Sequence, residues 1–192
     1  MKFKEKKQYR LPGYNYSKNG YYFITLCTKN REMFFGDVIE RIMNLSDIGK
    51  IANNFWLDIP KHFPHLKLHE YIIMPDHIHG ILEIDSGEIF VETRHCLVQR
   101  VDNDLENKRT GQCPVLTGSA FGHVTPKSLS TIIGSFKSIV SKIVNIQFPN
   151  VLFKWQPRFR DTIIRDEKAL YNFRRYVIYN PSNWLLDRNN LK

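Results

Sequence analysis

Two histidines separated by one residue are the first candidates for chemistry in this sequence. His77 and His79 stand at the start of an apolar run that ends at Ile84 and is typical of a β-strand. Because strand side chains alternate between faces, the two imidazoles face one side and Ile78 faces the other. Two adjacent imidazoles can share one divalent metal ion. A polar strand face explains the same pattern, so the pair alone leaves both interpretations open.

A tyrosine and an asparagine four residues apart are the second candidates. The apolar spacing predicts a final helix from about Asp166 to Tyr179 that ends before Pro181. At about 100° per residue, Tyr176 and Asn180 lie next to each other on the flank of the face that packs on the protein. If this helix packs on the histidine face of the sheet, the phenol and the amide oxygen can reach the pair. The alternative is a tyrosine at the core edge and an asparagine that caps the helix.

The segment that precedes and includes this helix is basic and aromatic. Single-stranded nucleic acid binds to such mixtures, because cations contact phosphates and flat rings stack on unpaired bases. We therefore predict DNA contacts from one aromatic and six cationic side chains: Arg10, Lys154, Trp155, Arg158, Arg160, Arg165 and Arg175. Trp155 fits a core position equally well, and the arginines fit a solvated face.

The composition agrees with a polyanionic partner. The chain has 192 residues, and its 28 Lys and Arg against 19 Asp and Glu give a net charge of +9. A sequence pI near 9.5 is typical of nucleic-acid-binding domains. The three cysteines have no CxxC spacing, which excludes a disulfide framework and a cysteine zinc site.

The same composition predicts a cytoplasmic protein with no membrane partner. An odd number of cysteines without a framework is typical of a reducing compartment. No apolar run approaches the roughly 18 residues of a membrane span. The charged N-terminus is followed by no apolar segment, so we expect no signal peptide.

The elements that would position these side chains alternate in a recognisable order. Turn residues and apolar spacing predict strands at 21–28, 66–73, 77–84 and 160–165, and helices at 46–59, 126–147 and the C-terminal segment. Ser46 or Asp47 would cap the first helix and Pro60 would end it. Thr125 and Pro126 would begin the second. The strands at 66–73 and 77–84 flank a Met-Pro-Asp turn and form a hairpin.

This order predicts an α+β protein with the ferredoxin-like split βαβ arrangement. The sheet would be antiparallel with helices packed on one face, and a further C-terminal helix would carry Tyr176. We expect one domain over residues 1–192, with a basic N-terminal arm at 1–20. Residues 86–126 are irregular and long for a connection, so they form either a functional flap or a partly disordered insertion.

Several motifs resemble those of the REP-associated tyrosine transposases, in the HUH superfamily of single-tyrosine transposases. The resemblance covers most of the chain, is poorest at 86–125, and rests on LPGY at 11–14, YYFIT at 21–25, MPDHIHG at 74–80, WQPRF at 155–159, IRD at 164–166 and YVIYNP at 176–181. Together these motifs are specific, whereas the His-x-His pair alone is not.

The resemblance implies a nuclease that nicks and rejoins single-stranded DNA, often beside a hairpin or in repeat DNA. It places His77 and His79 at the metal-ligand positions, with the bulky Ile78 between them. It makes Tyr176 the nucleophile and Asn180 the polar residue that completes a Mg²⁺ or Mn²⁺ site. Members of the superfamily act as monomers or as homodimers with shared sites, and the sequence leaves this choice open.

Three other functions remain open from the sequence. One is a DNA-binding module that keeps the fold and has lost catalysis. Another is a different HUH enzyme, a replication initiator or a relaxase, although those usually carry accessory domains. The last is a metal-dependent phosphoesterase that uses water, and its activity would survive Tyr176→Phe.

Overall fold

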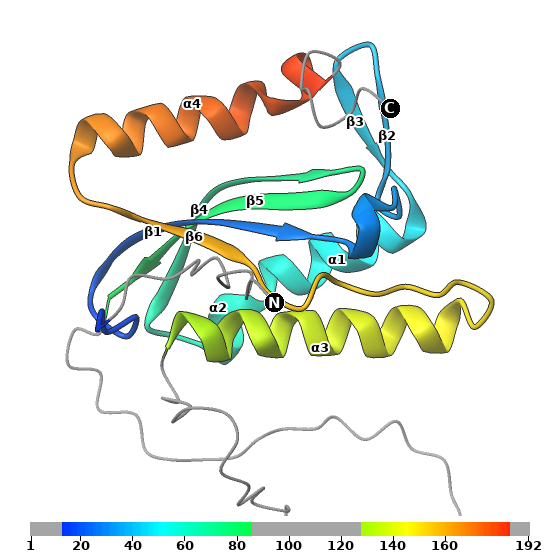
Figure 1. Ribbon diagram of the computed structural model, residues 1–192, viewed down its shortest axis with the longest axis horizontal. Coiled ribbons are helices and arrows are strands. Elements are labelled where there is room, and N and C mark those ends of the chain that lie inside the picture. Colours follow the sequence, from blue (N-terminus) through cyan, green and yellow to red (C-terminus); the bar gives the residue numbers. More distant parts are fainter. Residues whose placement is uncertain (1–12, 86–127, 185–192) are drawn as a thin grey trace, which may run out of the picture.

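A four-stranded antiparallel sheet forms the centre of the protein, with strand order β4-β5-β1-β6 (Figure 1). The computed structural model describes residues 13–85 and 128–184. The strands of this sheet are β1 (Gly20–Cys27), β4 (Leu66–Met74), β5 (His77–Ile84) and β6 (Arg160–Ile164). All three pairings are antiparallel, and this is the split βαβ topology predicted from the sequence.

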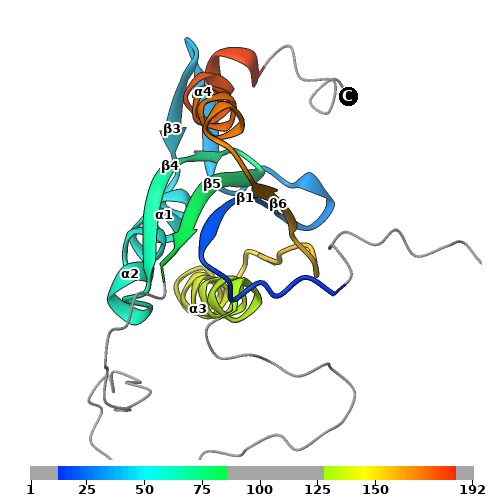
Figure 2. The ribbon, with the colours of Figure 1, turned by 90° about the vertical axis from the view of Figure 1, so that its left-hand side faces the viewer.

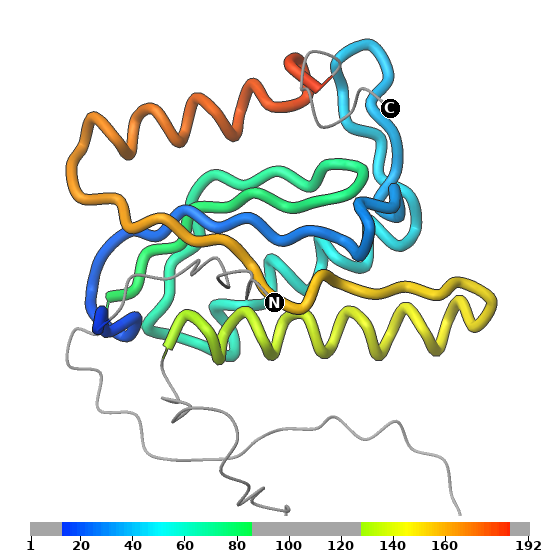
Figure 3. Tube along the Cα trace, in the orientation of Figure 1, coloured from blue at the N-terminus to red at the C-terminus, as the bar shows by residue number. Residues whose placement is uncertain are grey.

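The helices lie on both faces of the sheet. They are α1 (Asp47–Leu57), α2 (Ile59–His62), α3 (Leu129–Gln147) and α4 (Glu167–Asn183), with a short 3-10 turn, η1 (Lys29–Arg31). Figure 2 shows the sheet between α4 on one side and α1 and α3 on the other. This confirms the predicted layer of helices on one face and the additional C-terminal helix. Figure 3 shows how the chain leaves β6 and doubles back over the sheet as α4.

Alternate residues of the central strands supply two separate apolar clusters. Tyr22, Ile24 and Ile78 face α1 and α3 in the larger cluster, which includes Trp56. The smaller cluster, beneath α4, contains Phe23, Ile81, Ile164 and Val177. Gly80 belongs to the larger side, where a Cβ atom would lie 2.4 Å from the Trp56 ring. The period of two in β1 and β5 therefore divides the packing core from the face beneath α4.

Helix boundaries differ from the predicted ones where capping side chains decide them. The side chain of Ser46 accepts a hydrogen bond from the Gly49 amide and caps α1, as predicted. Pro60, predicted to end that helix, instead lies in the first turn of the short α2. Ser128 caps α3, so the prediction that Thr125 and Pro126 begin it is wrong.

Helix α4 continues through Pro181, although the sequence predicted an end before it. The prolyl ring costs one hydrogen bond near the helix end. The following turn is held because the buried Trp184 packs on His77, with ring centroids 5.8 Å apart. A two-stranded hairpin of β2 (Gly36–Ile39) and β3 (Ile42–Leu45) is a further element that the sequence analysis did not predict.

Helix α3 is long and apolar enough, with a mean hydropathy of 1.2, to cross a membrane by length and composition alone. Its apolar face (Leu129, Ile132, Ile133, Phe136, Val140 and Val144) is buried against the sheet and α1. A core helix passes the same test, and this packing accounts for the six buried apolar residues, whereas Ile146 near the helix end is exposed. Arg10, most of the predicted arm and the 86–126 insertion lie outside the described residues.

Candidate active site

His77 and His79 lie side by side on β5, on the sheet face that α4 covers. Their ring centroids are 4.4 Å apart, and the residues are 2% and 6% exposed. The predicted alternation is therefore confirmed, because Ile78 points into the opposite cluster. Two almost fully buried imidazoles on one face require partners that fix their orientation.

A carboxylate and a hydroxyl orient the two rings through their Nδ1 atoms. Nδ1 of His77 lies 2.6 Å from an oxygen of the buried Asp76 carboxylate, whose second oxygen is 2.7 Å from Nε of Arg31. Nδ1 of His79 lies 2.9 Å from the Thr25 hydroxyl, which stands directly opposite it on β1. With both Nδ1 atoms engaged, Nε2 is the nitrogen that each ring can present to a ligand.

The surroundings also keep His79 neutral. Burial lowers the pKa of His79 well below its ordinary value, and electrostatic interactions with neighbouring His77 and Arg31 act in the same direction. Desolvation disfavours the charged imidazolium, so the ring is neutral at neutral pH. Neutral imidazole is the form that binds a metal ion.

The turn before β5 is tied firmly to the rest of the sheet. The buried Thr28 donates through its backbone amide to the Asp76 carbonyl at 2.9 Å, and its hydroxyl lies 2.7 Å from the Glu32 carbonyl and 3.0 Å from the Asp76 carbonyl. Arg31 reaches Asp76 from η1, where Asn30 and Arg31 adopt positive φ angles of 55° and 60°. Such conformations cost of order 1–3 kcal/mol each and persist only where surrounding contacts hold them. The η1 turn thus places the Arg31 guanidinium beside the Asp76 carboxylate, which orients His77.

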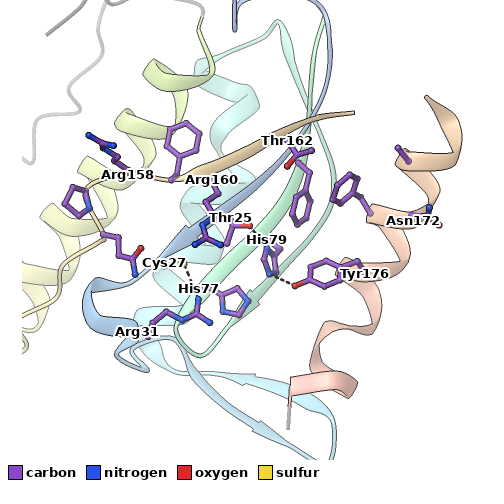
Figure 4. A pocket seen from close by; sticks show the side chains of 16 residues that line it. Thr25, Cys27, Arg31, His77, His79, Arg158, Arg160, Thr162, Asn172 and Tyr176 are labelled. Atoms are coloured by element: carbon purple, nitrogen blue, oxygen red, sulfur yellow. Dashed lines mark hydrogen bonds between the residues drawn. The ribbon is translucent and has the colours of Figure 1, made fainter. Parts of the chain in front are cut away.

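Helix α4 brings Tyr176 to the histidine pair, as the sequence predicted. The Tyr176 hydroxyl lies 3.3 Å from Nε2 of His79 (Figure 4). Two turns later, Trp184 packs on His77. Asn180 stands midway between these two contacts on the same side of the helix and is 8% exposed. One face of α4 therefore carries the tyrosine and the asparagine toward the histidines.

The position of α4 is set by packing and by one ion pair. Phe173 stacks on Phe23 of β1, with centroids 4.5 Å apart, and Phe23 in turn stacks on His79. Arg174 donates to Glu70 of β4 at 3.0 Å. These contacts hold the helix across the sheet and so fix the height of Tyr176 above His79.

A cleft of about 1080 Å³ opens beside the tyrosine and the histidines (Figure 4). The sheet contributes Thr25, Cys27, His77 and His79, and α4 contributes Asn172 and Tyr176. Arg31, Arg158 and Arg160 add three cations to its lining. Cationic walls around a tyrosine hydroxyl and two oriented imidazoles can offset the negative charge of a bound anion such as a phosphodiester.

The predicted DNA-contacting residues fall into three groups. Arg158 and Arg160 are exposed and line the cleft, whereas Lys154, Arg165 and Arg175 are exposed outside it. Trp155 is buried, packs on Phe35 and Phe136, and donates its indole N–H to the Lys137 carbonyl at 3.2 Å. It has no free ring face for a base, so its predicted DNA contact is corrected to a structural role. Arg10 lies outside the described residues.

Sequence reasoning missed three residues that orient the histidines. Asp76 directly precedes His77 in the MPDHIHG motif at 74–80, and this adjacency could have indicated its role. Thr25 depends on the register between β1 and β5, two strands far apart in the sequence, in which it stands opposite His79. Arg31 gave no sequence signal, because its approach depends on the positive φ angles of η1.

The described part of the chain, 13–85 and 128–184, holds no cluster of three His, Cys, Asp or Glu arranged for a metal ion. A metal ion at His77 and His79 would need a third protein ligand of another residue type. The amide oxygen of Asn180 is such a donor, and its residue lies between the two α4 contacts to the histidines.

A relative places the chain in a family. A curated protein of Haemophilus influenzae is 32% identical over 187 residues, which cover 95% of this chain and 92% of that protein. The chain belongs to the family of this protein. The relative carries no functional description beyond uncharacterized protein. No protein-family model matches the chain.

Solved structures identify the fold. A REP-associated tyrosine transposase bound to a REP hairpin superposes with a TM-score of 0.57 and 16% identity, covering 93% of this chain and 74% of that one. The chain has the fold of that transposase. A candidate transposase of Deinococcus radiodurans aligns with a TM-score of 0.44 and 16% identity, over 90% of this chain and 96% of that one.

Proposed function

We propose that this protein is a transposase-type endonuclease and strand transferase that acts on single-stranded DNA in the cytoplasm. The observation that carries the proposal is the Tyr176 hydroxyl, 3.3 Å from Nε2 of His79 in a cleft lined by arginines. The transposase fold supports it, because the relative with that fold binds a REP hairpin. The proposed partner is accordingly hairpin or repeat DNA with an unpaired strand in the cleft.

The residues of the site fit a divalent metal ion, Mn²⁺ or Mg²⁺. His77 and His79 would hold it through Nε2, and the Asn180 amide oxygen would complete a set of two nitrogens and one oxygen. Asp76 and Thr25 already occupy the Nδ1 atoms, which is the usual arrangement behind a metal-binding histidine. Neutral imidazoles suit Mn²⁺ better than Mg²⁺, which prefers oxygen. When bound, the ion would polarise the phosphoryl oxygens and offset their developing charge.

Tyr176 performs the covalent step of this proposal. Its phenolic oxygen attacks the phosphorus, forms a 5′-phosphotyrosine bond and releases its proton to solvent. The bond from phosphorus to the preceding 3′-oxygen breaks, and that oxygen takes up a proton to become a 3′-OH. The phosphodiester energy is kept in the new bond, so attack by a 3′-OH reverses the step and joins strands without ATP.

Chain residues around the cleft would bind and orient the DNA strand. Arg158 lies just before β6 and Arg160 is its first residue, and both line the cleft across from α4 (Figure 4). Their guanidinium groups can each contact phosphate oxygens, which positions a strand without reading its sequence. The Thr25 hydroxyl and the Asp76 carboxylate keep the imidazoles in place during both the nicking and the joining step.

Formation of a covalent adduct tests the proposal. The protein is incubated with single-stranded hairpin oligonucleotides from the repeats that flank its own gene, with Mn²⁺ or Mg²⁺, and products are separated on a denaturing gel. We expect a metal-dependent protein–DNA adduct that Tyr176→Phe and His77→Ala abolish. Tyr21→Phe is the matched control, because Tyr21 packs on His69 away from the cleft.

Two outcomes would replace the proposal by another function. Strand cleavage that leaves no adduct and persists in the Tyr176→Phe variant would identify a phosphoesterase that uses water. Binding of the hairpin without cleavage in either metal would identify a DNA-binding module that has lost catalysis.

A further inference from the structure

The outer side of α4 carries a regular row of two tyrosines and an arginine. Tyr171, Arg175 and Tyr179 follow one another at four-residue spacing, so they lie above one another on the helix. The Arg175 guanidinium carbon is 5.8 Å from both ring centroids, and the tyrosines are 59% and 52% exposed. These three residues are named the tyrosine–arginine ladder.

Packing of the described residues does not account for the ladder. The opposite side of α4 supplies the core contacts through Phe173 and Val177, and Arg174 supplies the ion pair to Glu70. Within the described ranges, Arg175 has no carboxylate at ion-pair distance. Helix α4 contains three cations, Lys168, Arg174 and Arg175, against one acidic residue, Glu167 in its first turn, so its own charge is net positive. Large exposed rings beside an unneutralised cation mark a surface for an aromatic, anionic partner.

The ladder is continuous with the candidate active site. A shallow hollow of about 410 Å³ lies on α4 and is lined by Asn172, Arg175, Tyr176, Tyr179 and Asn183. Asn172 and Tyr176 also line the large cleft, so the two depressions share an edge. The two asparagines, Asn172 and Asn183, add amide donors and acceptors to the lining of this hollow. Stacking surfaces, a cation and amides together match the bases, phosphates and base edges of an unpaired strand.

We propose that the ladder binds unpaired nucleotides that flank the phosphodiester held at Tyr176. The bases stack on the Tyr171 and Tyr179 rings, and Arg175 contacts the phosphate between them. This inference rests on the proposed function, because it gives the strand a route out of the catalytic cleft. Its ligand is single-stranded DNA, in contrast to duplex, whose paired bases offer no free faces to the rings.

Binding without cleavage tests the ladder independently of catalysis. The full chain is titrated, in EDTA, into a fluorescent 20-nucleotide oligo-dT strand and into a duplex of equal length, and anisotropy is recorded. The variant is Tyr171→Ala with Tyr179→Ala, and the matched control is Tyr171→Phe with Tyr179→Phe, which keeps both rings. We expect the alanine pair to weaken single-strand binding about ten- to hundredfold, with the phenylalanine pair close to wild type. Duplex binding should change less than threefold.

Arg175→Ala adds an electrostatic readout. Loss of one phosphate contact on a single strand lowers the slope of log affinity against log salt by about 0.7. Thermal melting of each variant checks that the helix is intact, because every substituted side chain is exposed.

Three results would overturn the ladder. One is an alanine pair that binds the single strand as tightly as wild type. Another is equal loss of single-strand and duplex affinity. The last is a concentration-dependent dimer in light scattering that the alanine pair abolishes, which would assign this surface to a second copy of the chain. Failure of the adduct experiment with intact single-strand binding would instead reject the proposed function and leave the ladder standing.

Discussion

The two faces of the central sheet are built from the same strands and serve different ends. On the face of α1 and α3, alternate residues of β1 and β5 are apolar and pack around the fully buried Trp56. On the face of α4, the intervening residues include Thr25, His77 and His79 and border a cleft of about 1080 Å³. Strand periodicity thus lets one segment supply stability on one side and chemistry on the other.

Trp56→Ala should have the largest effect, a loss of stability on the face of the sheet that packs on α1 and α3. Trp56 is fully buried, and its ring contacts Tyr71 and Phe136. Truncation of a buried tryptophan typically costs about 3–5 kcal/mol, because it loses transfer free energy and leaves a cavity. Urea unfolding measures the change.

Tyr176→Phe is the comparison on the other face of the sheet. This variant should keep the free energy of unfolding within about 0.5 kcal/mol of the wild-type value. Similar unfolding free energies for the two variants would contradict the division between faces.

Asp76→Asn should weaken metal binding on the α4 face of the sheet without unfolding the protein. The change removes the charge of the carboxylate that orients His77 and pairs with Arg31. Loss of such an outer partner typically lowers metal affinity about 10- to 100-fold. Calorimetric titration with Mn²⁺ gives the affinity directly. Asp58→Asn is the matched control, because it makes the same change at a carboxylate that pairs with Lys61 and does not line the cleft.

Unchanged Mn²⁺ affinity in Asp76→Asn would show that the carboxylate supports the turn and not a metal ligand. Equal losses in Asp76→Asn and Asp58→Asn would show a general effect of charge. Either result would remove the assigned role of Asp76.

A smaller effect is expected from the two cleft arginines. Arg158→Ala with Arg160→Ala removes two cations from the cleft lining. The slope of log affinity against log salt for a single strand should fall by about 1.4, or about 0.7 for each phosphate contact. Lys50→Ala with Lys61→Ala removes the same charge from α1 and α2, where both lysines pair with aspartates. An equal change in this control would mean that net charge, and not the cleft, governs binding.

The sequence predicted the parts of the site that depend on local periodicity. His77 and His79 share a face because strands alternate, and Tyr176 and Asn180 share one because helices turn about 100° per residue. For these two pairs to lie close together, the last helix had only to cross the histidine face of the sheet. The 3.3 Å distance from the Tyr176 hydroxyl to Nε2 of His79 confirms this for Tyr176.

Contacts set by tertiary packing or by unusual backbone were not predictable in this way. The ion pair of Arg31 with Asp76 depends on positive φ angles at Asn30 and Arg31. The side chains of these two residues do not indicate this backbone conformation. Trp155 suited a DNA contact and a core position equally, and only its packing on Phe35 decides for the core. The β2–β3 hairpin was missed because its strands are only four residues long.

Identification of the residue that carries the DNA tests the central claim most directly. The adduct formed with Mn²⁺ is digested with nuclease and trypsin, and the peptide 176–188 is fragmented in a mass spectrometer, since it contains both Tyr176 and Tyr179. We expect a nucleotide joined through its 5′-phosphate to Tyr176, whose hydroxyl contacts His79. A nucleotide on Tyr179 or on any other residue, or strand cleavage with no modified peptide, would contradict the account.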